Sequence, residues 1–200
     1  MASKDRIARL KEETRINILK AAFDIVKTEG WQALSMRKIA DAIEYTAPII
    51  YEYFANKEAI ILELTRQGYL KLAKKLQEAK DKHTSPAKQL EEMWLTYWNF
   101  AFANKELYQI MFGINASCSC EMVNKLPEAE CPWDIIADSI GKLMKIEDMD
   151  SEVICTKYYT FWSVVHGLVS INLVDRGNSD EVNKQVLRDA ITGIIRSITP

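Results

Sequence analysis

The chain has 200 residues, 48% of them hydrophobic and 27% charged, so it can bury the core of one large or two small domains and is not a disordered chain. Its formal net charge of −2 gives no hint of nucleic acid by itself, but residues 1–57 hold 10 Lys/Arg against 8 Asp/Glu while the other residues hold 16 against 20. The longest nearly apolar run, residues 158–174, contains Thr160, His166 and Asn172 and is too short for a membrane span.

Apolar residues recur at helical spacing almost everywhere, and no alternating strand pattern stands out. We therefore expect an all-α fold of about nine helices. The first helix is predicted for residues 9–28, with Gly30 ending it. It belongs to an expected three-helix domain over residues 1–55, which precedes a larger helical domain over residues 56–200.

Two short helices are predicted next. Ser35 is placed to cap one that runs to about residue 43, and Thr46 to cap the other, in which Pro48 falls in the first turn, where a missing N–H has no cost. A long helix followed by two short ones is the arrangement of a helix-turn-helix, whose second short helix reaches base edges in the major groove. The expected core consists of Phe23, Ile39, Ala40, Ile43, Ile50 and Phe54.

The rest of the chain predicts longer helices. One begins at Asn56 and continues to about residue 82. Ser85 and Pro86 start the next, which is expected to reach residue 112 and is apolar on most of its circumference. Residues 113–127 suggest a loop or a weak helix. Further helices are predicted for residues 128–146, 151–176 and 179–198, the last with Asn178 and Glu181 as a capping box.

The stretch ILKAAFDIVKTEGWQALSMRKIADAIEYTAPIIYEYFANKEAIILEL, residues 18–64, resembles the DNA-binding domain of the TetR family of bacterial transcriptional regulators. The matching positions are Ile18, Ala22, Gly30, Ile39, Ala40, Tyr51, Phe54, Lys57 and Glu58. The resemblance implies a cytoplasmic homodimer, usually a repressor, that reads an inverted repeat in double-stranded DNA with half-sites about 34 to 36 Å apart. The implied phosphate contacts are Ser35, Arg37, Tyr51 and Lys57, and the implied base contacts are Thr46, Ala47, Pro48 and Ile49.

Three positions depart from the family pattern. Glu44 stands where the turn usually has Gly, so it must take a left-handed conformation or reshape the turn. Tyr45 replaces a small apolar residue, and Ala47 replaces a frequent basic one. These departures bear on the operator sequence and affinity. The alternative to a DNA-binding motif is a helical hairpin with no DNA partner.

The segment FWSVVHGLVSIN, residues 161–172, resembles the Trp-His-Gly (WHG) signature of one branch of TetR-like carboxy-terminal domains, with Trp162, His166 and Gly167 as the match. A glycine in mid-helix costs about 1 kcal/mol relative to alanine, so we expect a close helix crossing at Gly167. The aromatic-rich second domain favours a small, largely apolar or aromatic effector, oriented by Tyr158, His166 or Asn172. The candidate ligand-binding residues are Trp94, Trp98, Phe102, Tyr108, Met111, Phe112, Trp133, Tyr158, Trp162 and His166, each of which could instead be core.

The last helix has two adjacent apolar columns, which is wider than a contact within one chain needs. We therefore predict that the last two helices form a four-helix dimer interface, although the protein's own core could also fill both columns. The expected interface residues are Val182, Val186, Ala190 and Ile194 in one column, which Ile198 continues, and Leu187, Ile191 and Ile195 in the other.

A cysteine-based redox or metal-responsive regulator is the alternative function, with Cys118, Cys120 and Cys131 as the sensing residues. No fourth ligand is evident, and we expect neither a metal nor a cofactor. Residues 1–20 lack the apolar core of a secretory leader, so free thiols in a reducing cytoplasm are expected.

An enzyme is not expected. Cys155 and His166 lie about 16 Å apart along a helix axis, and no phosphate loop, serine elbow or paired-carboxylate motif is present. A protein that only binds other proteins is a further alternative. A DNA-binding dimer differs from it because its affinity for DNA falls steeply as the salt concentration rises.

Overall fold

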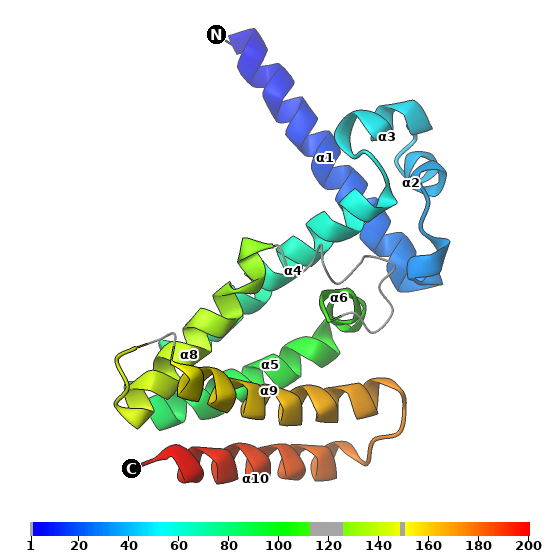
Figure 1. The fold of residues 1–200 in the computed structure, drawn as a ribbon. Helices are drawn as coiled ribbons and strands as arrows, with labels where there is room; N and C mark the ends of the chain where they lie inside the picture. Colours follow the sequence, from blue (N-terminus) through cyan, green and yellow to red (C-terminus); the bar gives the residue numbers. More distant parts are fainter. Residues whose placement is uncertain (1, 113–125, 149–150) are drawn as a thin grey trace. The chain divides into compact units, whose positions relative to one another are not determined.

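The computed structural model describes residues 2–112, 126–148 and 151–200 (Figure 1). These residues form nine α-helices and two 3-10 helices and contain no strand, which confirms the all-α prediction. The chain folds into two compact units. The first contains residues up to Gly68 and residues 109–112, and the second contains Tyr69–Tyr108 and the described residues from Leu126 onward. The predicted domain boundary near residue 55 stays a prediction.

The first unit begins with α1, which spans Ala2–Glu29 and so starts earlier than the predicted residue 9. The prediction was too short because it required an apolar face, whereas the Ala, Lys and Arg residues among residues 2–8 favour a helix by propensity alone. Gly30, with a φ of 82°, ends α1 as expected. The following elements of this unit are η1 (Trp31–Ala33), α2 (Met36–Ala42), α3 (Ala47–Tyr53) and the first half of α4 (Lys57–Lys80).

The core of this unit joins α1, α2 and α3. Ile18, Ile39 and Ile50 are fully buried, because α2 packs against both α1 and α3. Two residues of the predicted core, Phe23 and Ile43, are only half-buried. The prediction placed them too deep, and the Phe23 ring instead lies 4.9 Å from the Lys27 ammonium.

The turn between α2 and α3 is held by its backbone. Glu44 adopts a φ of 59°, the left-handed conformation that was one of the two expected outcomes. The Tyr45 N–H donates to the carbonyl of Ala40 and the Glu44 N–H to that of Asp41, which is the Schellman pattern of helix ends. A residue other than glycine therefore occupies the strained position without altering the motif.

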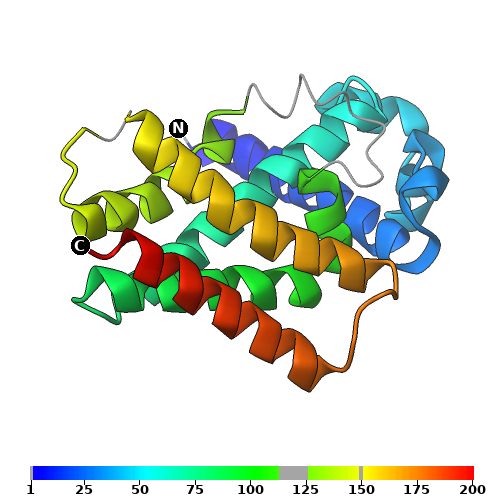
Figure 2. The same cartoon turned by 60° about the horizontal axis from the view of Figure 1, so that its bottom comes forward.

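The second unit contains the rest of α4, the first part of α6 and four further α-helices. α5 contacts α8, α9 and α10, and α9 also packs against α10, which runs beside it (Figure 2). The predicted inward residues Tyr69, Leu72 and Leu76 of α4 are buried. The elements after α4 are α5 (Pro86–Ala103), α6 (Lys105–Met111), η2 (Pro127–Ala129), α8 (Cys131–Met144), α9 (Glu152–Leu173) and α10 (Asp180–Ile198).

Two local predictions in this region were wrong. The single helix expected for residues 85–112 breaks at Asn104, whose side-chain amide donates to the Phe100 carbonyl and accepts from Lys71, so that α6 starts anew. The cap of α10 is Ser179, whose hydroxyl accepts from the N–H of Val182, and not Asn178, because Asn178 accepts from the Ser179 N–H.

Gly167 has no close neighbour among the described residues of this chain. A Cβ atom built on Gly167 would meet nothing within 4 Å, so no described part of this chain makes the predicted close crossing. A similar Cβ on Gly193 of α10 would also meet nothing. In the part of the chain that the structure describes, no helix has the length and apolar character needed to cross a membrane.

Candidate nucleic-acid interface, aromatic cluster and exposed helix face

The residues expected to contact DNA lie on α2, on α3 and at the start of α4. Ser35 caps α2, where its hydroxyl accepts from the Lys38 N–H at 3.2 Å. Thr46 precedes α3 but makes no side-chain capping bond, so its hydroxyl is not used by the helix. Arg37, Thr46, Pro48 and Tyr51 are exposed, and Ser35, Ala47, Ile49 and Lys57 are half-buried.

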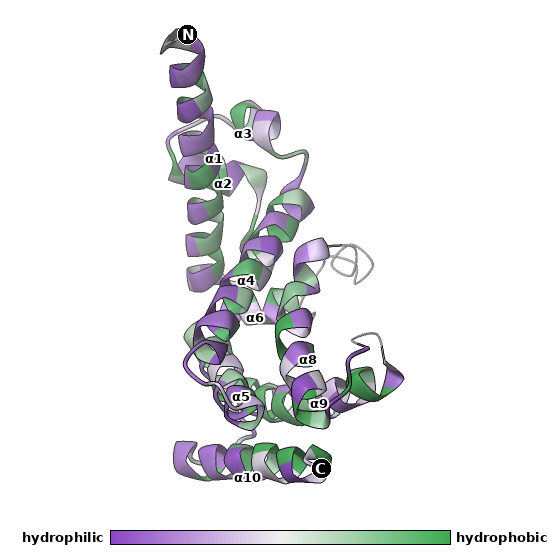
Figure 3. Cartoon of the chain, turned by 90° about the vertical axis from the view of Figure 1, so that its left-hand side faces the viewer, coloured by the Kyte–Doolittle hydropathy of each residue, from purple (hydrophilic) through white to green (hydrophobic). Residues whose placement is uncertain are grey.

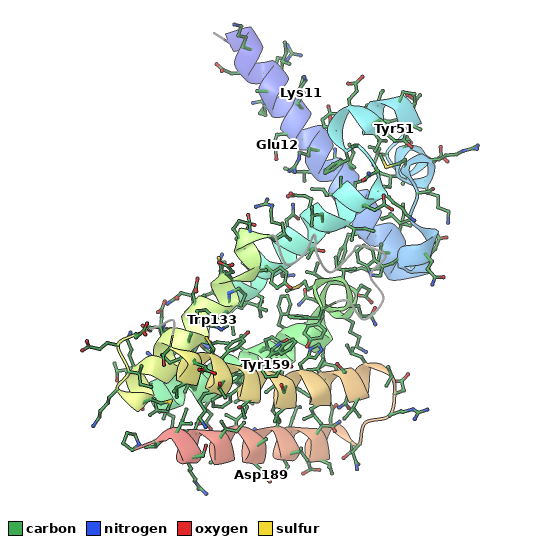
Figure 4. The ribbon with its side chains drawn as sticks, viewed as in Figure 1. Lys11, Glu12, Tyr51, Trp133, Tyr159 and Asp189 are labelled. Atoms are coloured by element: carbon green, nitrogen blue, oxygen red, sulfur yellow. The ribbon has the colours of Figure 1, made fainter. Side chains whose placement is uncertain are left out.

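Neighbouring residues of α3 divide into an anchored side and an exposed side. Ile50 is 0% exposed and Phe54 6% exposed, so both face the core. Tyr51 is 54% exposed and points away from it (Figure 4). Because consecutive residues of a helix differ in direction by about 100°, anchoring Ile50 fixes the direction of Tyr51.

The charges of α2 leave one cation available. Lys38 pairs with Glu29 at 2.6 Å, whereas Arg37 makes only a 4.0 Å contact with Asp41 and its side chain is 89% exposed. An exposed pair at that distance contributes little stability, so the guanidinium can turn to a phosphate at small cost.

An ion-pair network joins α1 to the first half of α4. Glu63 receives Arg66 at 2.9 Å and Arg15 at 3.2 Å, and Gln67 donates to the same carboxylate. Burial alone would raise the pKa of Glu63, but these donors outweigh it and hold the pKa below its ordinary value. The Arg15 guanidinium also lies 5.3 Å from the Phe54 ring centroid. The start of α4 is therefore fixed to the helix-turn-helix unit.

Aromatic rings of the second unit form a continuous cluster. Trp94 on α5 is fully buried, stacks on Phe161 with a centroid distance of 5.5 Å, and lies 5.9 Å from Tyr158. Trp162 stacks on His166 at 4.8 Å. The buried and half-buried rings linked in this way, which we call the aromatic cluster, are Trp94, Tyr97, Tyr108, Trp133, Tyr158, Phe161, Trp162 and His166. The exposed ring of Tyr159 adjoins the cluster, 5.9 Å from Trp162.

A chain of hydrogen bonds runs through the aromatic cluster. The Trp162 indole donates to the Tyr97 hydroxyl at 3.1 Å, and the Tyr97 and Tyr108 hydroxyls are 3.0 Å apart. The Tyr108 hydroxyl lies 2.5 Å from His166 Nδ1, and His166 Nε2 lies 3.4 Å from the Ser170 hydroxyl. Burial lowers the pKa of His166 and raises that of Tyr108, which favours a neutral ring that accepts from a neutral phenol.

Trp94 does not take part in this chain of hydrogen bonds. Its indole Nε1 is buried and has no hydrogen-bond partner among the described residues. Burying an N–H without a partner costs about 1 to 3 kcal/mol. The aromatic cluster therefore contains a donor that an acceptor would stabilise.

The predicted ligand-binding residues do not all join the aromatic cluster. Trp98 and Phe102 form a separate pair with ring centroids 4.5 Å apart, and Trp98 is 6% exposed. Met111 and Phe112 belong to the first unit, and their role stays a prediction. Tyr97 and Phe161 belong to the aromatic cluster but were not among the predicted ligand-binding residues, although Tyr97 stands one helical turn after Trp94 and Phe161 directly precedes Trp162.

One face of α9 and α10 is apolar and uncovered. On α9, Val153, Tyr159, Val164 and Ile171 are 38 to 63% exposed, and Lys157 is the only Lys, Arg, Asp or Glu among residues 153–174. On α10 the two predicted columns separate only in the first turns, where Val182 and Val186 are 42% and 47% exposed while Leu187 and Ile191 lie in the chain's own core. Toward the end of the helix Ala190, Ile194 and Ile195 are half-buried, and Ile198, which continues the first column, is 5% exposed.

The cysteines give the sensor alternative no support. Cys118 and Cys120 lie outside the described residues. Cys131 is a half-buried free thiol at the start of α8, and Cys155 is an exposed free thiol on α9. Within residues 2–112, 126–148 and 151–200, no group of three or more His, Cys, Asp or Glu could hold a metal ion.

Comparison with known proteins decides the family. Residues 18–64 match the bacterial regulatory proteins of the tetR family. Residues 90–192, more than half of the chain, match the tetracyclin repressor-like C-terminal domain. The chain belongs to the TetR family. It is a transcriptional regulator with a helix-turn-helix and a ligand-binding carboxy-terminal domain, and its relatives are regulators and not enzymes. The narrower WHG assignment stays a prediction.

Individual relatives are distant in sequence. An uncharacterized HTH-type transcriptional regulator of Haemophilus influenzae is 22% identical over 148 residues, covering 72% of this chain and 76% of that protein. A protein of unknown function from Rhodococcus sp. RHA1 has a TM-score of 0.78 at 18% identity, with 93% and 95% of the two chains covered. Thermus thermophilus FadR, a TetR family repressor in complex with lauroyl-CoA, has a TM-score of 0.62 at 17% identity, with 92% of each chain covered.

Proposed function

We propose that this TetR-family regulator is a repressor that binds an inverted-repeat operator as a homodimer and is released by a small, uncharged and largely apolar ligand. The observation that supports DNA binding most directly is the division of α3, where buried Ile50 fixes exposed Tyr51 outward. Thr46 and Pro48 are exposed at the start of the same helix and have no charge, so base recognition there relies on the Thr46 hydroxyl and on contact with thymine methyl groups.

Gel-shift titration of the purified protein against DNA fragments from around its own promoter tests this proposal. A fragment that shifts with an affinity falling steeply between about 50 and 200 mM salt supports a phosphate-anchored dimer. A protein that shifts none of these fragments in dilute buffer contradicts the proposal.

The homodimer is supported by the uncovered face of α9 and α10. Val153, Val164 and Ile171 on α9 and Val182 and Val186 on α10 are exposed, and apolar surface of this kind often marks a protein–protein interface. Gly167 lies in α9 with no neighbour to explain it, and close approach of a second copy would compensate its cost. A two-fold axis would bring the same two helices of each protomer together, as an isologous four-helix contact requires.

Sedimentation of a Val186→Asp variant tests the dimer. Val186 is 47% exposed, so the protomer can accept a carboxylate there, whereas an apolar interface cannot. We expect a dimer for the wild-type protein and a folded monomer for the variant at micromolar concentration. Arg188→Gln makes the same change in net charge at an exposed position of α10 and should leave the dimer intact. A dimer that survives Val186→Asp places the interface elsewhere.

The ligand class follows from the aromatic cluster. Its rings carry no formal charge, and burial disfavours the charged form of His166, so a neutral ligand is preferred to an anion. An acceptor atom on the ligand would satisfy the Trp94 indole. FadR is described with lauroyl-CoA, whose acyl chain is also apolar, so acyl chains and aromatic ketones are the first two classes to compare.

Thermal-shift measurements with 2-acetylnaphthalene, 2-ethylnaphthalene and 2-naphthoate separate these requirements. If the ketone 2-acetylnaphthalene raises the melting temperature more than the hydrocarbon 2-ethylnaphthalene, a hydrogen-bond acceptor for the Trp94 indole is supported. The carboxylate 2-naphthoate should raise it least. Methyl laurate, which has the same acyl chain without a charge, tests the acyl class in the same assay. If the hydrocarbon stabilises as strongly as the ketone, Trp94 does not select an acceptor.

Release from DNA is proposed to act through α4, which is the continuous helix shared by the two units. Its first half is tied to α1 by Arg15 and Glu63, and the division between the units falls at Gly68. A ligand bound beyond that glycine can therefore turn the first half of α4 and the helix-turn-helix together. The ligand must prefer the released state by about 5.5 kcal/mol to move the equilibrium from 1:99 to 99:1.

A further inference from the structure

We propose that the exposed basic start of α1, residues 4–11, binds the phosphate backbone of the operator DNA beyond the base pairs that α3 reaches. This inference rests on the proposed function and adds to it a second contact region on the same DNA. α1 begins at Ala2, well before residue 18, where the match to the tetR family begins. Its first turns run past α3 in two views and are coloured mostly hydrophilic (Figures 1 and 3).

The start of α1 is exposed around its whole circumference. Every residue from Lys4 to Glu13 is exposed, although only one side of a helix at a protein surface is ordinarily exposed. Residues 4–11 contain four cations, Lys4, Arg6, Arg9 and Lys11, against the single carboxylate of Asp5. Among the described residues, only Arg9 of these cations has an ion pair, a 3.6 Å contact with exposed Glu13. The other three are available to an external anion.

The helical repeat aligns part of this charge with α3. Lys4, Lys11 and Arg15 share one face of α1, since seven residues span almost two turns. That face is turned toward α3, because Ala8, Lys11, Glu12 and Arg15 line a groove together with Glu52 and Tyr53. Figure 4 labels Lys11 and Glu12 on α1 and Tyr51 on the neighbouring α3.

The row of cations therefore starts beside the recognition helix and continues away from it. Lys4 lies about 10 Å beyond Lys11 along the helix axis, at 1.5 Å per residue. This distance equals about three base-pair steps of a duplex. Residues 4–11 are already helical before binding, so the contact would have a small entropic cost. DNA is the occupant that matches both the positive charge and the continuity with α3.

The test compares salt dependence among three forms of the full-length protein. The probe is a duplex from around the protein's own promoter with at least one helical turn of flanking DNA on either side. The variant Lys4→Gln/Lys11→Gln removes two cations from this row, and Gln sustains a helix nearly as well as Lys. The control Lys74→Gln/Lys75→Gln removes the same charge from exposed positions of α4 in the second unit.

We expect the slope of log Kobs against log salt to become shallower by about 1.8 per protomer in the α1 variant, about 0.9 for each lost phosphate contact. The control variant should keep the wild-type slope. Trimming the duplex to the base pairs that the α1 variant protects should remove the difference between wild type and variant.

The possible outcomes separate the two proposals. A wild-type protein that binds the duplex with the same slope as the α1 variant overturns the role of α1 and leaves the operator proposal standing. Equal losses in both variants indicate a general charge effect and also overturn it. A wild-type protein that binds no duplex overturns the proposed function and this inference with it. Circular dichroism of each variant confirms that α1 remains helical.

Discussion

The two units of this regulator place their functional residues in opposite ways. In the first unit the residues proposed to bind DNA are exposed or half-buried and come from one continuous stretch, from Ser35 to Lys57. In the second unit the aromatic cluster is assembled from α5, α6, α8 and α9, and its members Trp94 and Tyr108 are fully buried. A DNA surface needs outward side chains at a set spacing, whereas a ligand site needs inward side chains from several helices.

This difference predicts how mutations act. In the first unit, stability and function belong to adjacent residues, so they can be changed separately. In the second unit, the side chains that would bind a ligand also form the core, so a change in one alters the other. The uncovered face of α9 and α10 is the exception within the second unit, because it is apolar and yet exposed.

The largest effect should come from Ile191→Asp. Ile191 is 1% exposed, and an unpaired carboxylate there should cost several kcal/mol, more than many domains can lose. We expect the second unit to lose its fold, seen as loss of near-ultraviolet circular dichroism from its tryptophans. The exposed Val186→Asp on the same helix should keep that signal. Equal behaviour of the two variants would show that the two columns of α10 do not differ as described.

A smaller and more specific effect is expected from Tyr51→Ala on α3. Removing this exposed ring should leave the free energy of unfolding within about 0.5 kcal/mol of wild type. Loss of a phosphate contact should weaken binding about tenfold per half-site, or about 1.4 kcal/mol, on specific and random DNA alike. Fluorescence anisotropy with both duplexes measures this.

Ile50→Ala is the matched comparison for Tyr51→Ala. Ile50 is fully buried, so its truncation should cost about 2 to 5 kcal/mol of stability in the first unit. A Tyr51→Ala protein that binds random DNA normally but loses one base preference would contradict the phosphate role. Unfolding of the Tyr51→Ala protein would show that the two sides of α3 are not separable.

The sequence predicted the first unit closely because its rules are local. Ser35 caps α2, Gly30 ends α1, and Glu44 takes a left-handed turn, and each of these follows from a residue and its immediate neighbours. Asn56 likewise starts α4, where its side chain accepts from the Ala59 N–H at 2.8 Å.

The second unit was predicted less well for physical reasons. Helical periodicity shows that two columns of α10 are apolar but not which one faces the core, because that depends on contacts with α5 and α9. The break at Asn104 depends on Lys71, 33 residues earlier in the chain. The Tyr97 hydroxyl hydrogen-bonds to Trp162 and Tyr108, which lie on other helices, so its role could not be seen from its own helix.

Replacing residues in the left-handed conformation with glycine should raise the free energy of unfolding modestly in both units. Glu44 and Lys145 each have a φ of 59° at a helix end. Replacing either with Gly relieves about 1 to 2 kcal/mol of strain and increases the entropy of the unfolded chain, for a net gain of about 0.5 to 1 kcal/mol. Denaturant unfolding followed in each unit measures this gain. A loss of stability in Glu44→Gly alone would mean that the Glu44 side chain stabilises the turn.

The smallest effect concerns the protonation of His166. Burial lowers its pKa in the folded protein, so below its unfolded value near 6.5 the unfolded chain binds the proton more readily than the folded one. Stability from the neutral ring is therefore present above that pH and is lost as the pH falls. We expect the melting temperature to drop more between about pH 7.5 and 5.5 in the wild-type protein than in His166→Gln, whose amide can still accept from Tyr108. If the melting temperatures of the two proteins fall in parallel, protonation of His166 does not limit stability. The preference for an uncharged ligand, which was inferred partly from His166, would then have less support.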